Sequence, residues 1–109
     1  MKTPVLVLLS LFIAGTAHAR GDAAKGKEKA AQVCAACHGP EGGKPSAPDQ
    51  PVLAGQYEDY LVKALSDYKS DKRKNPIMNG FASQLSKKDM EDLAAWFSGQ
   101  KTSPLHDQR

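Results

Sequence analysis

The sequence is short of several features, and each shortage excludes a class of protein. Its 109 residues include only two cysteines, too few for a scaffold held together by disulfides. The formal net charge of +3 is far below that of a typical nucleic-acid-binding domain. There is no internal repeat, and no run shows the apolar/polar alternation of a half-buried β-strand. Together, the few cysteines, the low net charge and the lack of repeats and strand patterns predict one small all-α domain that does not bind nucleic acid.

The one long apolar run, residues 5–15, is too short to cross a membrane, which takes about 20 apolar residues. A lysine precedes the run, and a small-x-small cleavage pattern that ends at Ala19 follows it. We therefore predict a secretory signal peptide over residues 1–19. The mature domain, residues 20–109, would have no membrane span and would lie outside the cytoplasm.

Three main helices are expected, joined by segments rich in proline and glycine. The first covers residues 22–38, from the N-cap residue Asp22 to a Gly-Pro pair that cannot continue a helix. The second covers residues 57–69, where apolar side chains recur with the i, i+3, i+4 spacing of one buried face. The third opens at Ser86 with a capping-box pattern and ends at Gly99.

Two connecting segments are expected to be irregular. Residues 39–56 hold four prolines and four glycines, so no regular element is predicted there. A loop of this length in a compact domain is often explained by a ligand that it wraps. Residues 75–82, between the second and third helices, contain Asn-Pro and Asn-Gly pairs and are also expected to be irregular.

The chemistry is carried by the stretch Cys-Ala-Ala-Cys-His, from Cys34 to His38. Residues i and i+3 of a helical turn share a face, so the sulfurs of Cys34 and Cys37 point the same way. A haem against that face could take a thioether bond from each sulfur and an axial nitrogen from His38. The five-residue pattern is the signature of c-type haem attachment.

Three other interpretations of the cysteine pair each lack a part. A zinc site needs two more ligands, and the mature chain offers only His106 in a polar tail and scattered carboxylates. A thioredoxin-like dithiol belongs in a βαβ pattern, and no strand is predicted. A simple disulfide stays possible, but it explains neither His38 nor the long loop.

The opposite face of a haem needs a ligand or stays open, and three residues are candidates. Met90 lies on the apolar stripe of the third helix and is expected to fill the core. His106 lies in a polar tail near the C-terminus. Met78 follows His38 by 40 positions, so the chain can carry it to the other side of the ring. An imidazole and a thioether would fill both axial positions, which favours one-electron transfer and disfavours an enzyme.

Together these features resemble the class I cytochromes c, especially small bacterial periplasmic ones and one half of the two-haem cytochrome c4-like group. The resemblance covers essentially the whole mature chain. It is carried by Gly26, the Cys-x-x-Cys-His signature, the Pro-Val-Leu-Ala-Gly-Gln stretch at 51–56, Met78 and the aromatic-ended last helix. It implies a small cytochrome c fold in the periplasm, with one covalently bound haem c because only one signature is present.

The resemblance also implies roles for single residues. Cys34 and Cys37 would form the thioethers, and His38 and Met78 would be the axial iron ligands. Pro51, by its place in the motif, would accept a hydrogen bond from the His38 ring on its backbone carbonyl, with Pro48 as the alternative. Separately, Gly26 would let the first and last helices cross closely, against Trp96 or Phe97.

The expected function is that of a soluble carrier of single electrons between redox proteins, such as a membrane cytochrome complex, a dehydrogenase, an oxidase or a reductase. An alternative is a haem subunit of a larger dehydrogenase or sulfur-oxidising complex, and a less favoured one is a haem-based ligand sensor. Four cations precede the Met78 segment: Lys69, Lys72, Arg73 and Lys74. They could steer an acidic redox partner, although such a charge run is often only a solvated face.

Overall fold

The computed structural model describes residues 2–10 and 21–101. Within them it contains no β-strand and five helices: α1 (Ala23–Val33), α2 (Ala35–His38), α3 (Glu58–Lys69), α4 (Pro76–Ser83) and α5 (Lys87–Ser98). The predicted all-α class is confirmed. None of the described helices has the length and apolar character that a membrane crossing requires. Most of the predicted signal peptide, with its cleavage site at Ala19, and His106 lie outside the described residues.

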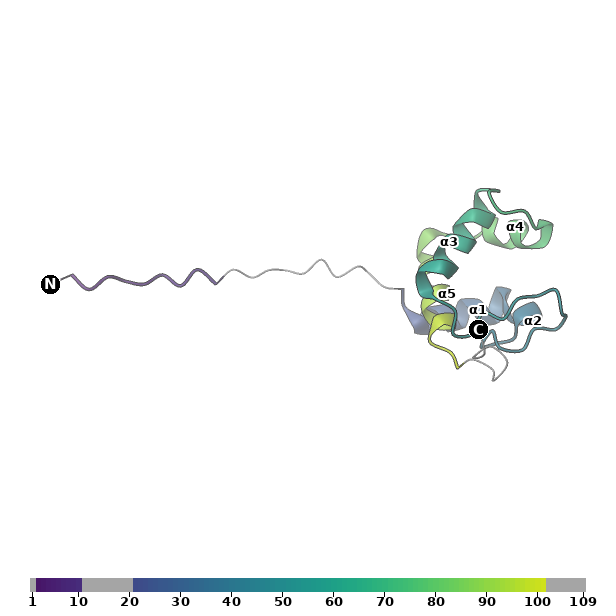
Figure 1. Cartoon of the computed structure of the whole chain (residues 1–109), viewed down its shortest axis with the longest axis horizontal. Coiled ribbons are helices and arrows are strands. Elements are labelled where there is room, and N and C mark those ends of the chain that lie inside the picture. The colour runs from purple at the N-terminus through teal and green to yellow at the C-terminus, as the bar shows by residue number, and fades with distance from the viewer. Residues whose placement is uncertain (1, 11–20, 102–109) are drawn as a thin grey trace.

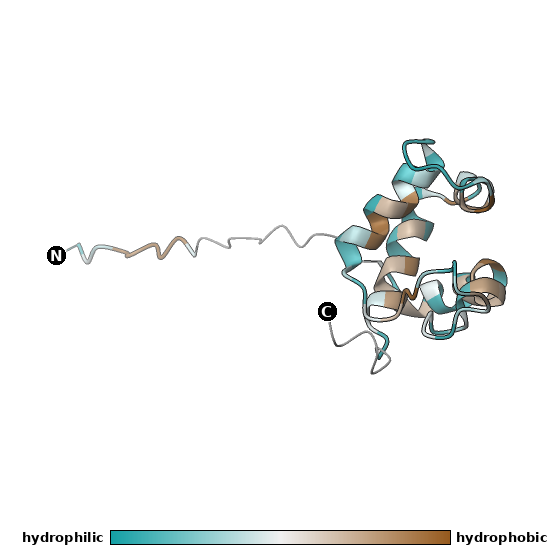
Figure 2. Ribbon diagram, turned by 45° about the vertical axis from the view of Figure 1, so that its right-hand side comes forward, coloured by the Kyte–Doolittle hydropathy of each residue, from teal (hydrophilic) through white to brown (hydrophobic). Residues whose placement is uncertain are grey.

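Helix α5 is the centre of the fold, because both α1 and α3 pack against it. Helix α2 continues from α1, and α4 packs on α3. In Figure 1, α2 and α4 project on the same side of the three packed helices, near opposite ends of α3. The buried apolar cluster consists of Ala30, Leu61, Leu85, Met90, Leu93, Ala94 and Phe97. Apolar residues, brown in Figure 2, also run through α4, which contributes little to that cluster.

The predicted helix boundaries hold for α3 and α5 but not for the first helix. Helix α5 begins with the expected capping box, in which Ser86 and Asp89 each accept a backbone N–H of the other. The first helix, expected over residues 22–38, is divided at Cys34. The N–H groups of both Cys37 and His38 donate to the Cys34 carbonyl, so a new hydrogen-bond ladder starts there. The division sets the cysteine-bearing turn apart from α1.

The expectation of an irregular segment over residues 75–82 was wrong, because most of it is α4. Asn75 is the N-cap, and its side chain accepts hydrogen bonds from the N–H groups of Ile77 and Met78. Pro76 follows at the first helical position, where a missing N–H costs nothing. The Asn-Pro pair therefore starts a helix here, although the same pair also suits a turn. Met78 is consequently a helical residue.

The predicted close crossing of the first and last helices at Gly26 is confirmed. A Cβ atom on Gly26 would lie 1.9 Å from the Asp92 carbonyl oxygen and 2.9 Å from the Cβ of Trp96. Only glycine allows the two backbones to approach this closely. Trp96 is the aromatic partner of Gly26, whereas Phe97 lies against Gly42 in the long loop. Met90 fills the core, as predicted. Its sulfur accepts a hydrogen bond from the Ser66 hydroxyl at 3.7 Å.

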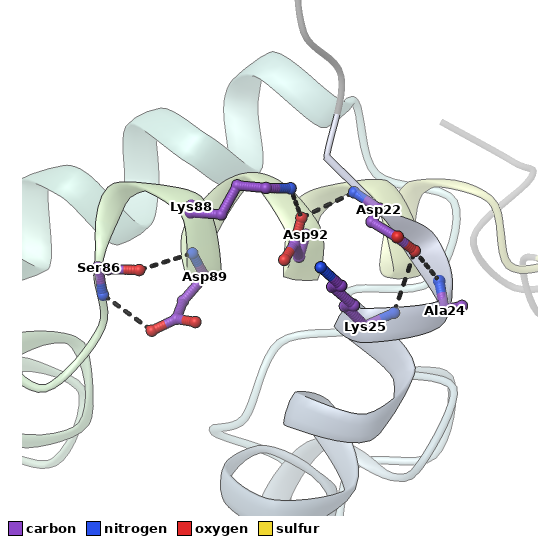
Figure 3. Close-up of polar contacts among 7 residues, drawn as sticks. All are labelled: Asp22, Ala24, Lys25, Ser86, Lys88, Asp89 and Asp92. Atoms are coloured by element: carbon purple, nitrogen blue, oxygen red, sulfur yellow. Dashed lines mark hydrogen bonds and ion pairs between the residues drawn. The ribbon is translucent and has the colours of Figure 1, made fainter.

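A buried carboxylate fastens the start of α1 to α5 (Figure 3). Asp92 accepts a 2.7 Å hydrogen bond from the Asp22 N–H and a second from the Lys88 ammonium. Asp22 in turn caps α1 by accepting from two N–H groups of its first turn. Burial alone would raise the pKa of Asp92, but the bonds from Lys88 and the Asp22 N–H outweigh it and hold that pKa below its ordinary value. The folded state therefore favours the charged carboxylate.

We expect Asp92→Ala to lower the free energy of unfolding by about 2 kcal/mol at neutral pH, because charge-assisted hydrogen bonds are lost. Thermal denaturation followed by circular dichroism measures the change. A lowered pKa means that the stabilisation is present above the unfolded pKa of about 4 and is lost as pH falls through the folded value. The difference in free energy of unfolding between wild type and variant should therefore shrink below about pH 4. An undiminished gap at lower pH would contradict this role of the carboxylate.

Candidate functional site

Three of the predicted site residues come together at α2. Cys34 immediately precedes this helix, and Cys37 and His38 are its last two residues. Both cysteines are half-buried free thiols. The turn that carries them is closed by hydrogen bonds of 3.2 and 3.0 Å from the N–H groups of Cys37 and His38 to the Cys34 carbonyl. One short stretch of the chain, residues 34–38, therefore carries two sulfurs and one imidazole.

A hydrogen bond to a backbone carbonyl fixes the His38 ring. The side chain is only 6% exposed, and its Nδ1 lies 2.9 Å from the carbonyl oxygen of Pro51. A carbonyl can only accept, so Nδ1 carries the proton and donates it. In the neutral ring, Nε2 is then the nitrogen with a lone pair for a metal ion. Pro51, and not Pro48, occupies this position.

The long loop, residues 39–56, forms no helix or strand, as expected. It is held in place near both of its ends. Gly39 has a φ of +83°, a left-handed conformation that suits glycine and ends α2. Further along, the Gly55 N–H donates to the Phe97 carbonyl at 2.9 Å. The Trp96 indole N–H donates to the Pro40 carbonyl at 3.0 Å. No local sequence pattern predicts this last bond, which joins residues 56 positions apart.

The environment of the cysteines disfavours the competing interpretations. Burial raises the pKa of the Cys34 thiol to about 11, the nearby Cys37 adds to this, and Lys29 partly opposes it. A redox dithiol needs a thiol with a lowered pKa, because the thiolate is the reactive form. Within residues 2–10 and 21–101, no group of three or more His, Cys, Asp and Glu residues is arranged to hold a metal ion. Neither a thioredoxin-like dithiol nor a zinc site therefore fits the described residues.

Met78 lies apart from this cluster, on α4. It is half-buried, and its N–H donates to the Asn75 side chain at 3.2 Å. On the same helix, Ile77 is 66% exposed and Phe81 is 42% exposed. Large apolar side chains left open beside a thioether suit a helix that a flat apolar ring would cover. The donor groups of this chain therefore fit a covalently bound haem: they are two thiols, one free imidazole nitrogen and one thioether.

The four cations before α4 are all exposed but differ in their contacts. Lys69 donates to the Leu85 carbonyl. The Arg73 guanidinium donates a hydrogen bond to the Tyr60 hydroxyl at 3.3 Å. Its central carbon lies 4.9 Å from the centre of the Tyr68 ring. Lys72 and Lys74 are exposed, and neither forms an ion pair with a residue that the structure describes. Lys69 and Arg73 are therefore held by contacts within the domain, whereas Lys72 and Lys74 make no such bond with the described residues; all four side chains keep their charge, because the acceptors are neutral.

Comparison with known proteins places the chain in a family. A cytochrome c family model matches residues 23–101. Cytochrome c4 of Pseudomonas aeruginosa is 51% identical over 102 residues, which make up 94% of this chain and 50% of that protein. The crystal structure of reduced recombinant cytochrome c4 from Pseudomonas stutzeri matches with a TM-score of 0.69 and 47% identity, over 76% of this chain and 47% of that one. The chain belongs to the cytochrome c family.

This membership confirms the predicted class I cytochrome c fold and the predicted cofactor, covalently bound haem c. The chain spans about half the length of the cytochrome c4 relatives that it matches. A more distant relative, from Stutzerimonas stutzeri, is named thiosulfate dehydrogenase electron acceptor. It is 41% identical over 70 residues, covering 64% of this chain and 32% of that protein.

Proposed function

We propose that the protein is a one-electron carrier of the bacterial periplasm, with a six-coordinate haem c bound by His38 and Met78. Cys34 and Cys37 form the thioethers, and the Pro51 carbonyl holds the His38 ring. The observation that carries the proposal is the buried His38 side chain, whose Nδ1 is engaged by Pro51 at 2.9 Å while Nε2 keeps its lone pair. The haem, when bound, supplies an iron that cycles between the ferric and ferrous states.

The chain's own residues set the properties of that iron. The hydrogen bond from Nδ1 to the Pro51 carbonyl orients the ring and makes Nε2 a more basic ligand. The Met78 thioether is a soft ligand that favours the ferrous state and raises the reduction potential. If His38 and Met78 both bound the iron of the haem, no position would stay open for oxygen or a substrate. The arrangement favours electron transfer and disfavours an enzyme or a five-coordinate sensor.

Export to the periplasm is supported by the N-terminal segment. We propose that residues 1–19 are a signal peptide and that residues 20–109 form the mature cytochrome domain. The apolar residues Val5–Leu9 are each at least 76% exposed. They add nothing to the buried core, so their removal leaves the packing of the domain unchanged.

A second candidate is supported by the relative named as the electron acceptor of thiosulfate dehydrogenase. In that case the electron donor would be a sulfur-oxidising dehydrogenase, and the protein would serve it as a haem subunit or as a partner that binds only transiently. Lys72 and Lys74 offer an exposed positive charge for an acidic partner of either kind. Co-purification of a catalytic chain from the native host would favour a permanent subunit over a free carrier.

We expect the secreted protein to have the mass of residues 20–109 plus one haem. The haem should stay attached in denaturing alkaline pyridine, with the absorption band of two saturated thioether links. Cys34→Ala and Cys37→Ala should each leave one unreacted vinyl group and shift that band to longer wavelength. Mass spectrometry and the pyridine spectrum measure both properties. A mass that retains residues 1–19 would contradict the signal peptide, and a colourless wild type would contradict the site.

We expect Met78→Ala to lower the reduction potential and to let the ferrous haem bind carbon monoxide, because the thioether ligand is removed. Redox titration and the carbon monoxide difference spectrum measure the two changes. The matched control is Met90→Leu, since Met90 fills the core and a swap of similar volume is tolerated. An unchanged potential and no carbon monoxide binding in Met78→Ala would rule out Met78 as a ligand.

We expect Lys72→Glu and Lys74→Glu each to slow oxidation of the ferrous protein by ferricyanide roughly threefold at low ionic strength, because local positive charge steers an anion. The effect should disappear at high salt. Stopped-flow absorbance measures the rates. Lys25→Glu makes the same change of charge on α1 and is the control. Equal slowing in all three variants would mean that only the net charge acts, and not a local surface beside α4.

A further inference from the structure

The side-chain amide of Asn79, directly after Met78, makes three hydrogen bonds at once. Its Oδ1 accepts from the Asn75 N–H at 2.9 Å. Its Nδ2 donates to the carbonyls of Tyr68 at 2.8 Å and Arg73 at 2.9 Å. One side chain therefore joins the end of α3, the basic turn after it and the start of α4. We call this set of three bonds the Asn79 latch.

The carbonyls that the latch engages lie outside the regular hydrogen bonding of the helices. Tyr68 belongs to the last turn of α3, and its carbonyl otherwise accepts only from backbone N–H groups just after the helix, such as that of Asp71 at 3.4 Å. Arg73 lies in a turn that also contains Asp71, a non-glycine residue with a φ of +62°. Asn79 uses both of its amide hydrogens and its oxygen there. Aspartate keeps the acceptor but has no N–H to donate, and alanine has neither.

Helix α4 depends on this latch because its apolar packing on α3 is slight. Ala82 is its one buried residue. Ile77 and Phe81, which a bound haem would cover, are 66% and 42% exposed and do not anchor α4 to the rest of the protein. Its described packing partner is α3, the helix to which Asn79 is bonded. A segment with few buried contacts opens locally at a low free-energy cost, so each polar anchor has a large effect on how often it opens.

We propose that Asn79 is the positioning residue for the Met78 ligand: its latch holds α4 against α3 so that the neighbouring thioether stays on the iron. The inference rests on the proposed function, in which Met78 is an axial ligand. Asn79 does not touch the haem in this role. It acts by lowering the fraction of molecules in which α4 has moved away and the iron has lost its sulfur ligand.

Competition by free imidazole tests the latch in the ferric holoprotein. An external ligand binds only when Met78 is off the iron, so its apparent affinity reports that fraction. The loss of the two Nδ2 bonds should tighten imidazole binding about tenfold in Asn79→Asp, and the loss of all three should tighten it further in Asn79→Ala. The sulfur-to-iron charge-transfer band should weaken in the same order. Both properties are measured by optical titration.

Two further variants make the result decisive. Met78→Ala gives the imidazole affinity of a haem with no thioether, and Asp92→Ala lowers global stability through a contact between α1 and α5. If Met78→Ala binds imidazole like the wild type, the ligand assignment and the proposed function fail together. If Met78→Ala binds tightly but both Asn79 variants match the wild type, only the latch is overturned. A gain in Asp92→Ala equal to that of Asn79→Ala would also overturn it, because global destabilisation would then suffice.

Discussion

The hydrogen bond between the His38 ring and the Pro51 carbonyl is the constraint on which the site depends. It selects the tautomer in which Nε2 is available, and it fixes the plane of the ring. It also ties α2 to the far side of the long loop, 13 residues away. The loop can hold Pro51 in place because α5 anchors it, through the Trp96 indole and the Phe97 carbonyl. The closeness of α1 and α5 at Gly26 places α2 beside that anchor.

The sequence predicted the parts of the structure that depend on local pattern. The capping box at Ser86 and the apolar spacing of residues 57–69 each define an element without help from distant contacts. The Cys-x-x-Cys-His signature identifies its cofactor in the same way. Helix α4 was missed because Asn-Pro is compatible with both a turn and a helix start, and its packing on α3 settles the choice.

The contacts that support the site were the least predictable part. The bond from Trp96 to Pro40 and the bonds from Asn79 to Tyr68 and Arg73 join residues brought close only by the packing of helices. Nothing near Asn79 in the sequence distinguishes it from a turn residue, since Asn-Gly is a common turn pair. The division of the first helix at Cys34 is also a tertiary effect, because Ala-rich sequence on both sides favours continued helix.

The two sides of the proposed haem site are held in different ways, and this difference has a physical consequence. The His38 side is fixed by the chain on which both cysteines lie and by a loop anchored to the core helix α5. The Met78 side is a short helix with one buried residue and a polar connection to α3. With the proposed ligands, a change in iron ligation is therefore easier at Met78 than at His38, because fewer contacts within the protein hold the Met78 side. The basic turn, whose Arg73 carbonyl is bonded to Asn79, lies next to that weaker side. A partner bound at Lys72 and Lys74 would contact the segment that governs the thioether, while the imidazole side would be left undisturbed.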